Sequence, residues 1–128
     1  MNPAAAAAGA DSVVIDNNLA VTTSVNGSAL DVRSYDGAAK VGLAVNQTAG
    51  TTPTLDAKIQ ESATSGGTYT DVVNGAFTQV TTVDGNQEIQ IPDVAQLKGF
   101  IRVAYATGGT SPAYTVTSKF VSQKKYRS

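Results

Sequence analysis

The sequence predicts an all-β protein, a two-sheet antiparallel β-sandwich of jelly-roll-like type with one short helical turn and an extended N-terminal arm. Short segments along the chain alternate apolar and polar residues, or are rich in β-branched residues, as strands with one buried face do. Asn-Gly and Asp-Gly pairs, which accept the positive φ of tight turns, separate several of these segments. The composition, 41% hydrophobic and 15% charged over 128 residues, indicates one folded domain rather than a disordered chain.

We expect the strands in segments that alternate or are β-branched, and we expect turns at the Asx-Gly pairs. The strand segments are residues 12–15, 19–25, 28–35, 39–46, 54–61, 68–73, 76–82, 87–91, 99–106 and 113–121. The turn pairs are Asn26-Gly27, Asp36-Gly37, Asn74-Gly75 and Asp84-Gly85. Many short strands with frequent turn signals favour a sandwich or a barrel.

The helical turn is expected in "PDVAQLKG". Asp93 can cap its first turn, Val94 and Leu97 lie on one side, and Gly99 ends it. We therefore place a single turn of helix between two strands.

The alternation also predicts which residues are buried. In "KVGLAVNQ", Val41, Leu43 and Val45 share one face, and the small residues Gly42 and Ala44 on the other face allow a second surface to approach closely. The residues that we expect in or near the core are Leu55, Ile59, Ile101, Val103, Tyr114, Val116 and Phe120.

The chain divides into a flexible N-terminal arm (1–12), a β-sandwich domain (13–121) and a basic C-terminal tail (122–128). The arm combines Pro3, a run of Ala and Gly9, and it has nothing to pack against. It contains neither the basic residue nor the apolar run of a signal peptide. No stretch approaches the roughly 20 apolar residues of a membrane helix. We expect a protein made in a cytoplasm, without contact to a membrane.

The absence of His and Cys excludes the catalytic groups that use a histidine base or a thiol. Asp84, Asn86 and Glu88 place oxygen atoms at alternate positions, as some calcium loops do, but no further acids follow at the spacing of such a loop. A hairpin turn that leads into a polar strand is the interpretation that we favour for them. We predict no enzymatic activity, no catalytic residue, no cofactor and no metal site.

The charges are divided along the chain. All ten acidic residues lie at or before Asp93, whereas six of the nine basic residues follow it, so the first 93 residues carry a net charge of −7 and the last 35 carry +6. Such a division suits head-to-tail contacts or docking on an acidic surface. A fold that mixes the two regions evenly is the open alternative. The pI of about 5.1 and the single basic cluster argue against nucleic-acid binding.

A series of short β segments carries a family resemblance. It begins with "YDGAAKVGLAVNQTAGTTPTLDAKIQESATSGGTYTDV" and continues through "AFTQVT", "LKGFIRV", "GGTSPAYTV" and "KKY", between Tyr35 and Tyr126. This series resembles small structural proteins encoded in the virion gene clusters of tailed bacteriophages, of the β-sandwich type that decorates or cements the capsid. The N-terminal 34 residues lie outside the resemblance.

The resemblance implies a non-enzymatic decoration or cement protein on the outer capsid surface of the virion. Its partners would be the major capsid protein and further copies of the chain, as a trimer or a dimer. A receptor- or glycan-binding module of a head fibre or tail is the alternative that stays open.

We expect the arm and the basic tail to lie at the partner interface, the tail against an acidic patch on the capsid protein or on an adjacent copy. The candidate interface residues are Pro3, Lys119, Lys124, Lys125 and Arg127. The candidate acids on an adjacent copy are Asp31, Asp36, Asp56 and Glu61.

Overall fold

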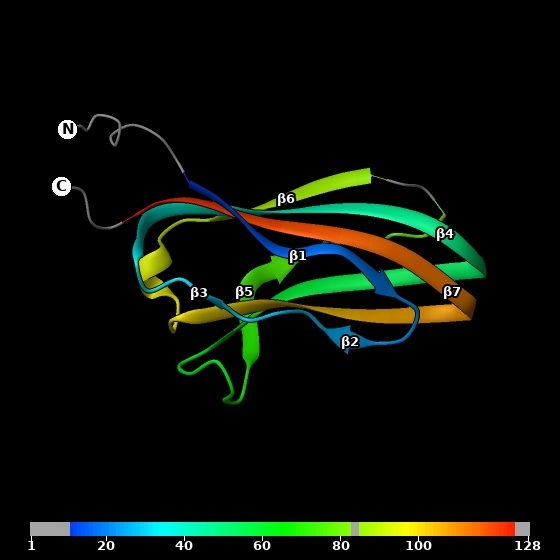
Figure 1. Cartoon of the computed structure of the whole chain (residues 1–128), viewed down its shortest axis with the longest axis horizontal. Helices are drawn as coiled ribbons and strands as arrows, with labels where there is room; N and C mark the ends of the chain where they lie inside the picture. The colour runs from blue at the N-terminus through cyan, green and yellow to red at the C-terminus, as the bar shows by residue number, and fades with distance from the viewer. Residues whose placement is uncertain (1–10, 83–84, 125–128) are drawn as a thin grey trace.

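The computed structural model describes residues 11–82 and 85–124, which form a two-layer β-sandwich (Figure 1). Hydrogen bonding joins all of its strands into one seven-stranded sheet. The sheet is folded over on itself, so that one part forms the upper layer of Figure 1 and the other part forms the lower layer. This confirms the prediction of an all-β, sandwich-like fold.

Two long strands run through both layers. β4 (Tyr35–Ser62) and β7 (Phe100–Lys124) pair antiparallel along their whole lengths, and their register shifts repeatedly near the middle, where both strands bend. The first half of β4 and the second half of β7 therefore lie in the upper layer. The other two halves lie in the lower layer (Figure 1).

Shorter strands complete the upper layer. β1 (Asp11–Val21) pairs with the second half of β7, and β6 (Gly85–Ile91) pairs with the first half of β4. The order of the upper layer is thus β1-β7-β4-β6, with β1 and β6 at its edges.

The lower layer is completed in the same way. β2 (Val25–Asn26) and β3 (Leu30–Asp31) pair with the first half of β7, and β5 (Thr70–Ala76) pairs with the second half of β4. The edges of the lower layer are therefore β2 and β3 on one side and β5 on the other.

The bend between the layers depends on glycine. Gly50 and Gly109 have φ values of 126° and 93°, in the region that favours glycine. A side chain at Gly109 would meet the carbonyl oxygen of Thr52 and would lie 2.9 Å from Cα of Pro53. The two strands can therefore cross closely at the bend only because this position has no side chain.

The core lies between the two layers, and the alternation predicted its members. All seven predicted core residues are buried, with at most 1% of each exposed. Val41, Leu43 and Val45 point into the core as expected, and Tyr35 contacts the Phe120 ring edge-on at 5.1 Å between ring centroids.

The strand boundaries differ from the predicted ones in a systematic way. The segments 39–46 and 54–61 are the two halves of β4, and 99–106 and 113–121 are the two halves of β7. The polar and glycine residues between the halves lie outside the predicted strands, but the backbones of β4 and β7 continue to pair through the bend. Of the predicted strand 76–82, Ala76 is the last residue of β5, and the residues after it contribute only an isolated bridge between Leu55 and Val80.

Two of the predicted tight turns are irregularities inside strands. Gly37, with φ 75°, lies near the start of β4, where the pairing with β7 shifts register, and Asn74, with φ 59°, lies inside β5. The Asx-Gly pairs do provide positive φ there. At these positions the positive φ bends a strand and does not reverse the direction of the chain.

The helical turn is confirmed as the 3₁₀ helix η1 (Val94–Gln96). Asp93 Oδ1 accepts a hydrogen bond from the Ala95 N–H at 3.0 Å, Val94 is buried, and Gly99 follows with φ 129°.

The strands extend past residues 13 and 121, the predicted ends of the β-sandwich domain. β1 already begins at Asp11, which pairs with Ser122, and β7 continues to Lys124. Most of the predicted arm (1–10) and the last four residues of the predicted tail (125–128) lie outside the described residues. Within the part that is described, no helix is long and apolar enough to cross a membrane.

Candidate functional site

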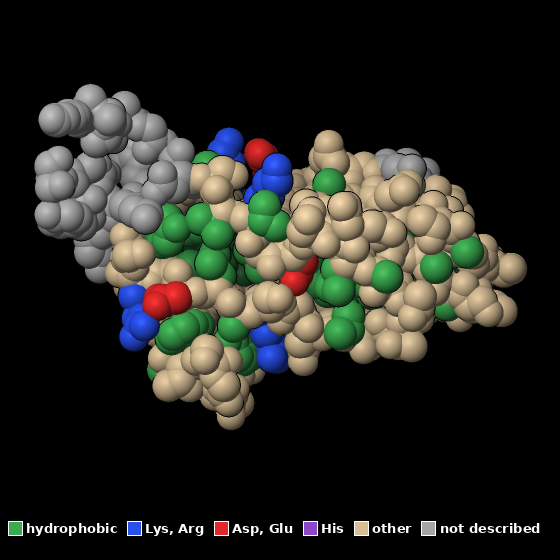
Figure 2. Space-filling model, in the orientation of Figure 1, with side chains coloured by type: hydrophobic (Ala, Val, Ile, Leu, Met, Phe, Trp, Pro, Cys, Tyr) green, Lys and Arg blue, Asp and Glu red, His purple; other side chains and the backbone are tan. Residues whose placement is uncertain are grey.

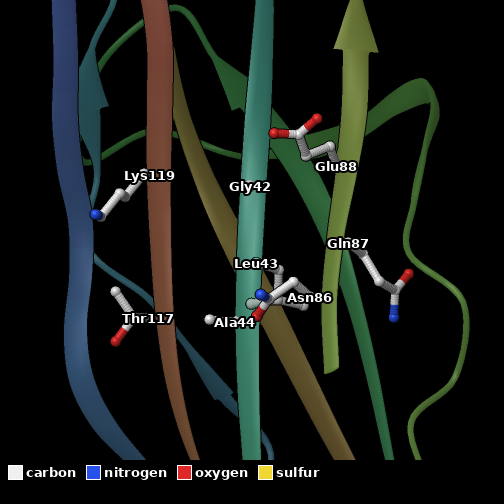
Figure 3. Close-up of a pocket in the computed structure, with 8 residues that line it drawn as sticks. All are labelled: Gly42, Leu43, Ala44, Asn86, Gln87, Glu88, Thr117 and Lys119. Carbon is white, nitrogen blue, oxygen red and sulfur yellow. The ribbon is translucent and has the colours of Figure 1, made fainter. Parts of the chain in front are cut away.

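A shallow groove of about 450 Å³ lies on the outer face of the upper layer (Figure 3). Gly42 and Ala44 of β4 form its floor, because their neighbours on the same strand point into the core. A methyl group added at Gly42 would meet only the Gln87 carbonyl oxygen, at 3.9 Å. The small residues thus leave room for an approaching surface, as the alternation predicted.

Charged residues of opposite sign flank the floor. Lys119 of β7 and Glu88 of β6 are the two cross-strand partners of Gly42, and Thr117 and Asn86 hold the same positions beside Ala44. Figure 3 shows Lys119 and Thr117 on one side of β4 and Glu88 and Asn86 on the other. The strand register alone places these residues on the two sides of the floor.

The two charges differ in how they are paired. Glu88 Oε1 lies 3.8 Å from Lys40 Nζ, an exposed pair that contributes little to stability. No carboxylate among the described residues lies within ion-pair distance of Lys119. Its ammonium can therefore bind an acidic partner without breaking an internal ion pair.

The other predicted interface residues are only partly described. Lys124 is the last residue of β7 and the Cα partner of Tyr35. Pro3, Lys125 and Arg127 lie outside the described residues, as does the side chain of Lys124. Of the five, the structure places Lys119 alone in the groove.

Of the acids that were predicted to form a patch on an adjacent copy, Asp31 and Asp56 have internal side-chain partners, and the side chain of Asp36 lies outside what the structure describes. The guanidinium of Arg33 binds Asp31 at 2.7 Å, and this hydrogen bonding lowers the pKa of Asp31 to about 2. Asp56 accepts hydrogen bonds of 3.2 Å from the Gln79 amide. Glu61 lies an odd number of residues from Asp56 on β4 and therefore points to the opposite face of the layer.

A buried polar cluster is the feature that the sequence patterns did not predict. Asp16 is only 6% exposed, and its carboxylate accepts hydrogen bonds from the Ser28 N–H at 2.9 Å, the Tyr105 hydroxyl at 2.9 Å and the Ser118 hydroxyl at 3.2 Å. Burial raises the pKa of Tyr105, so its hydroxyl stays protonated and donates. The hydrogen bonds of this cluster link β1 to β7 and to the β2–β3 connection. In the sequence, only the position of this acid directly after the apolar run "VVI" indicates the cluster.

The proposed oxygen ligands of a calcium loop do not form a described cluster. Asn86 and Glu88 lie on β6, on the outer face, and Asp84 lies outside the described residues. Within the described ranges, no group of three or more acidic side chains is placed to hold a metal ion.

Comparison with known proteins identifies the fold but not a family. No protein-family model matches the chain, and no curated protein matches it. Among solved structures, the SPBc2 prophage-derived protein YomS matches with a TM-score of 0.54 at 13% identity, over 88% of this chain and 93% of YomS. The VP2 subviral particle of infectious bursal disease virus matches with a TM-score of 0.53 at 14% identity, over 90% of this chain. The chain spans about a third of VP2, 32% of its length. At these identities the likeness shows a shared fold.

Proposed function

We propose that the chain is a structural protein of a tailed-phage virion, which decorates and stabilises the capsid from its outer surface. The observation that carries the proposal is the fold. Nearly the whole chain shares it with a prophage-derived protein and with the VP2 protein of a subviral particle. The resemblance of the segments between Tyr35 and Tyr126 to phage decoration proteins, noted from the sequence, supports the same role.

The groove on the upper layer is the surface that we assign to the capsid. Its floor of Gly42 and Ala44 lets a partner backbone come close, and Lys119 offers a cation without an internal ion-pair partner among the described residues. An acidic edge or loop of the major capsid protein fits this combination of shape and charge.

Stabilisation in this role is a matter of binding, and the chain needs no catalytic group, cofactor or nucleic acid for it. A protein that bridges neighbouring capsomers buries surface only when the shell is closed. Its binding free energy therefore adds to the stability of the closed shell and opposes opening under the pressure of packaged DNA.

The proposal is tested on phage particles and on bare capsids. Quantitative mass spectrometry of purified virions should find the protein at hundreds of copies, and an electron-microscopic reconstruction should place it on the outer capsid surface. A few copies at a fibre or a tail tip would support the receptor-binding alternative and contradict this proposal.

A variant whose side chain fills the groove tests whether the groove binds the capsid. Gly42→Phe places a ring over the floor without entering the core, because position 42 faces outward, and purified variant protein should bind bare capsids at least about tenfold more weakly in co-sedimentation. Gly66→Phe, on an exposed loop where an added side chain meets nothing, is the matched control. Equal binding by the two variants would remove the groove from the interface.

A further inference from the structure

A second groove, of about 530 Å³, opens at the edge of the sandwich between β5 and β6 and beside η1. β5 and β6 are edge strands of different layers and do not pair with each other, so the space between the layers is open on this side. Val72, Ile89 and Leu97 line the groove with half-buried apolar surface. Val73, also in the lining, is 86% exposed.

The same edge is closed further along. There the Phe77 N–H donates to the Ala57 carbonyl at 2.9 Å, and the Gln87 side chain both accepts from the Thr78 N–H at 2.8 Å and donates to the Thr78 carbonyl at 2.9 Å. No comparable segment among the described residues covers Ile89 and Val72. The apolar lining is thus exposed over one part of the edge, and an extended segment like residues 77–80 is what would cover it.

The groove carries negative charge that is not neutralised internally. The Glu61 carboxylate accepts a 3.0 Å hydrogen bond from the Lys98 N–H, and the Asp93 carboxylate accepts one of the same length from the Ala95 N–H. Neither lies within ion-pair distance of a cation among the described residues, since the Lys98 ammonium donates to the Thr70 hydroxyl instead. An occupant of this groove should therefore combine an apolar group with positive charge.

We propose that the groove binds the C-terminal segment of a second copy of this chain, "KKYRS", residues 124–128. In this segment Tyr126 is flanked by Lys125 and Arg127, so one aromatic ring stands between cations. The ring packs on the apolar lining, and the cations lie beside Glu61 and Asp93. Tyr suits such a half-open site, because its ring is apolar and its hydroxyl can stay in water.

The tail of a second copy can enter the groove with fewer constraints than the chain's own tail. β4 separates β7 from β6 in the upper layer, so two strand spacings, about 10 Å in all, lie between β7 and β6. Tyr126 is two residues beyond Lys124, so its Cα can lie at most about 7 Å from that of Lys124. Within one chain the ring could reach the groove only with the tail fully extended toward β6, whereas the tail of a second copy has no such constraint.

Each copy then offers one tail and one groove, which lie at different places on the surface. Such a contact is head-to-tail, and it forms a closed ring when the rotation between copies closes. This inference does not depend on the proposed capsid function, because it is tested on the purified protein without particles.

The first experiment measures self-association of the full chain by sedimentation over a range of protein concentrations and salt. The variant Glu61→Gln with Asp93→Asn keeps both backbone hydrogen bonds and removes both charges. It should associate about tenfold more weakly, and its association should depend less on salt. Asp56→Asn with Glu88→Gln makes the same charge change outside the groove and should associate like the parent. Equal behaviour of the two double variants overturns the proposal.

The second experiment tests the tail directly. A fluorescent peptide SQKKYRS, residues 122–128, should bind the full-length Tyr126→Ser variant in an anisotropy titration, and a peptide with Ser in place of Tyr should bind at least about tenfold more weakly. A parent chain that stays monomeric at every concentration contradicts the proposal. So does a Tyr126→Ser substitution that shifts the Val72 and Ile89 amide signals of a monomer, since the chain's own tail would then fill the groove.

Discussion

Among single residues, Asp16 has the environment that differs most from what its type prefers. A carboxylate that is 6% exposed, with hydrogen bonds from Tyr105, Ser118 and Ser28 but with no basic partner among the described residues, is stable only while those donors stay in place. Gly27 fits beside it because a side chain there would collide with the carboxylate.

Asp16→Ala should lower the free energy of unfolding by about 2–5 kcal/mol, because it leaves buried donors without an acceptor, at about 1–3 kcal/mol for each unsatisfied group. Urea denaturation measures the loss. Asp56→Ala, at an exposed carboxylate, is the control and should change stability by no more than about 0.5 kcal/mol. A similar result for the two variants would mean that the buried cluster does not stabilise the fold.

Tyr105 makes the stability depend on alkaline pH. Burial raises its pKa in the folded protein above the ordinary value of about 10, so the folded chain keeps a proton that the unfolded chain releases. Its contribution is complete below about pH 10 and is lost as the pH rises further. Tyr105→Phe should therefore be less stable than the parent near about pH 8, and the difference should shrink by about pH 11. A difference that is constant with pH would contradict this assignment.

Among the elements, β4 and β7 determine the architecture, because each contributes one half to each layer. Two features allow this. Their inward-facing residues alternate regularly in both halves, and glycine at the bend permits the close crossing.

Ile101→Ala, in the first half of β7, should cost about 2–5 kcal/mol, because the residue is fully buried and the lost side chain leaves a cavity. Val73→Ala on β5 removes apolar atoms at a position that is 86% exposed and should change the stability of the monomer by no more than about 0.5 kcal/mol. Thermal and urea unfolding of both variants measure the contrast. An Ile101→Ala variant as stable as the parent would refute the assigned core.

Gly109→Ala should destabilise the bend by more than about 1 kcal/mol, since φ is 93° and the added methyl group meets the Thr52 carbonyl. Gly66→Ala is the matched control, because its φ is ordinary and its surroundings are open. Calorimetry of the two variants compares them. If both melt at the same temperature, the bend does not require glycine.

At the scale of the whole molecule, the described chain begins and ends at one place, because Asp11 and Ser122 are paired. Deletion of residues 2–10 keeps that pair intact. It should leave the melting temperature unchanged while it weakens attachment to capsids, if the segment orders on a neighbour as segments that fold on binding do. Melting curves and co-sedimentation measure the two effects separately. Unfolding of the deleted chain, or unchanged attachment, would contradict the predicted arm.

The local pattern of the sequence was sufficient to predict the all-β class, the buried faces and η1. The alternation that places Val41, Leu43 and Val45 inside and Gly42 and Ala44 outside repeats every two residues, and such a pattern needs no knowledge of distant segments.

Only the tertiary structure decided how these faces meet. The contact between Asp16 and Ser118 joins residues 102 positions apart. β4 and β7 are continuous strands because their backbones pair through a bend whose residues the local pattern does not predict as strand. The groove at Gly42 required the register that places Lys119 and Glu88 on either side, and the groove at the open edge required two layers whose edges stay unpaired. Register and layer closure depend on contacts between distant segments, which local alternation does not encode.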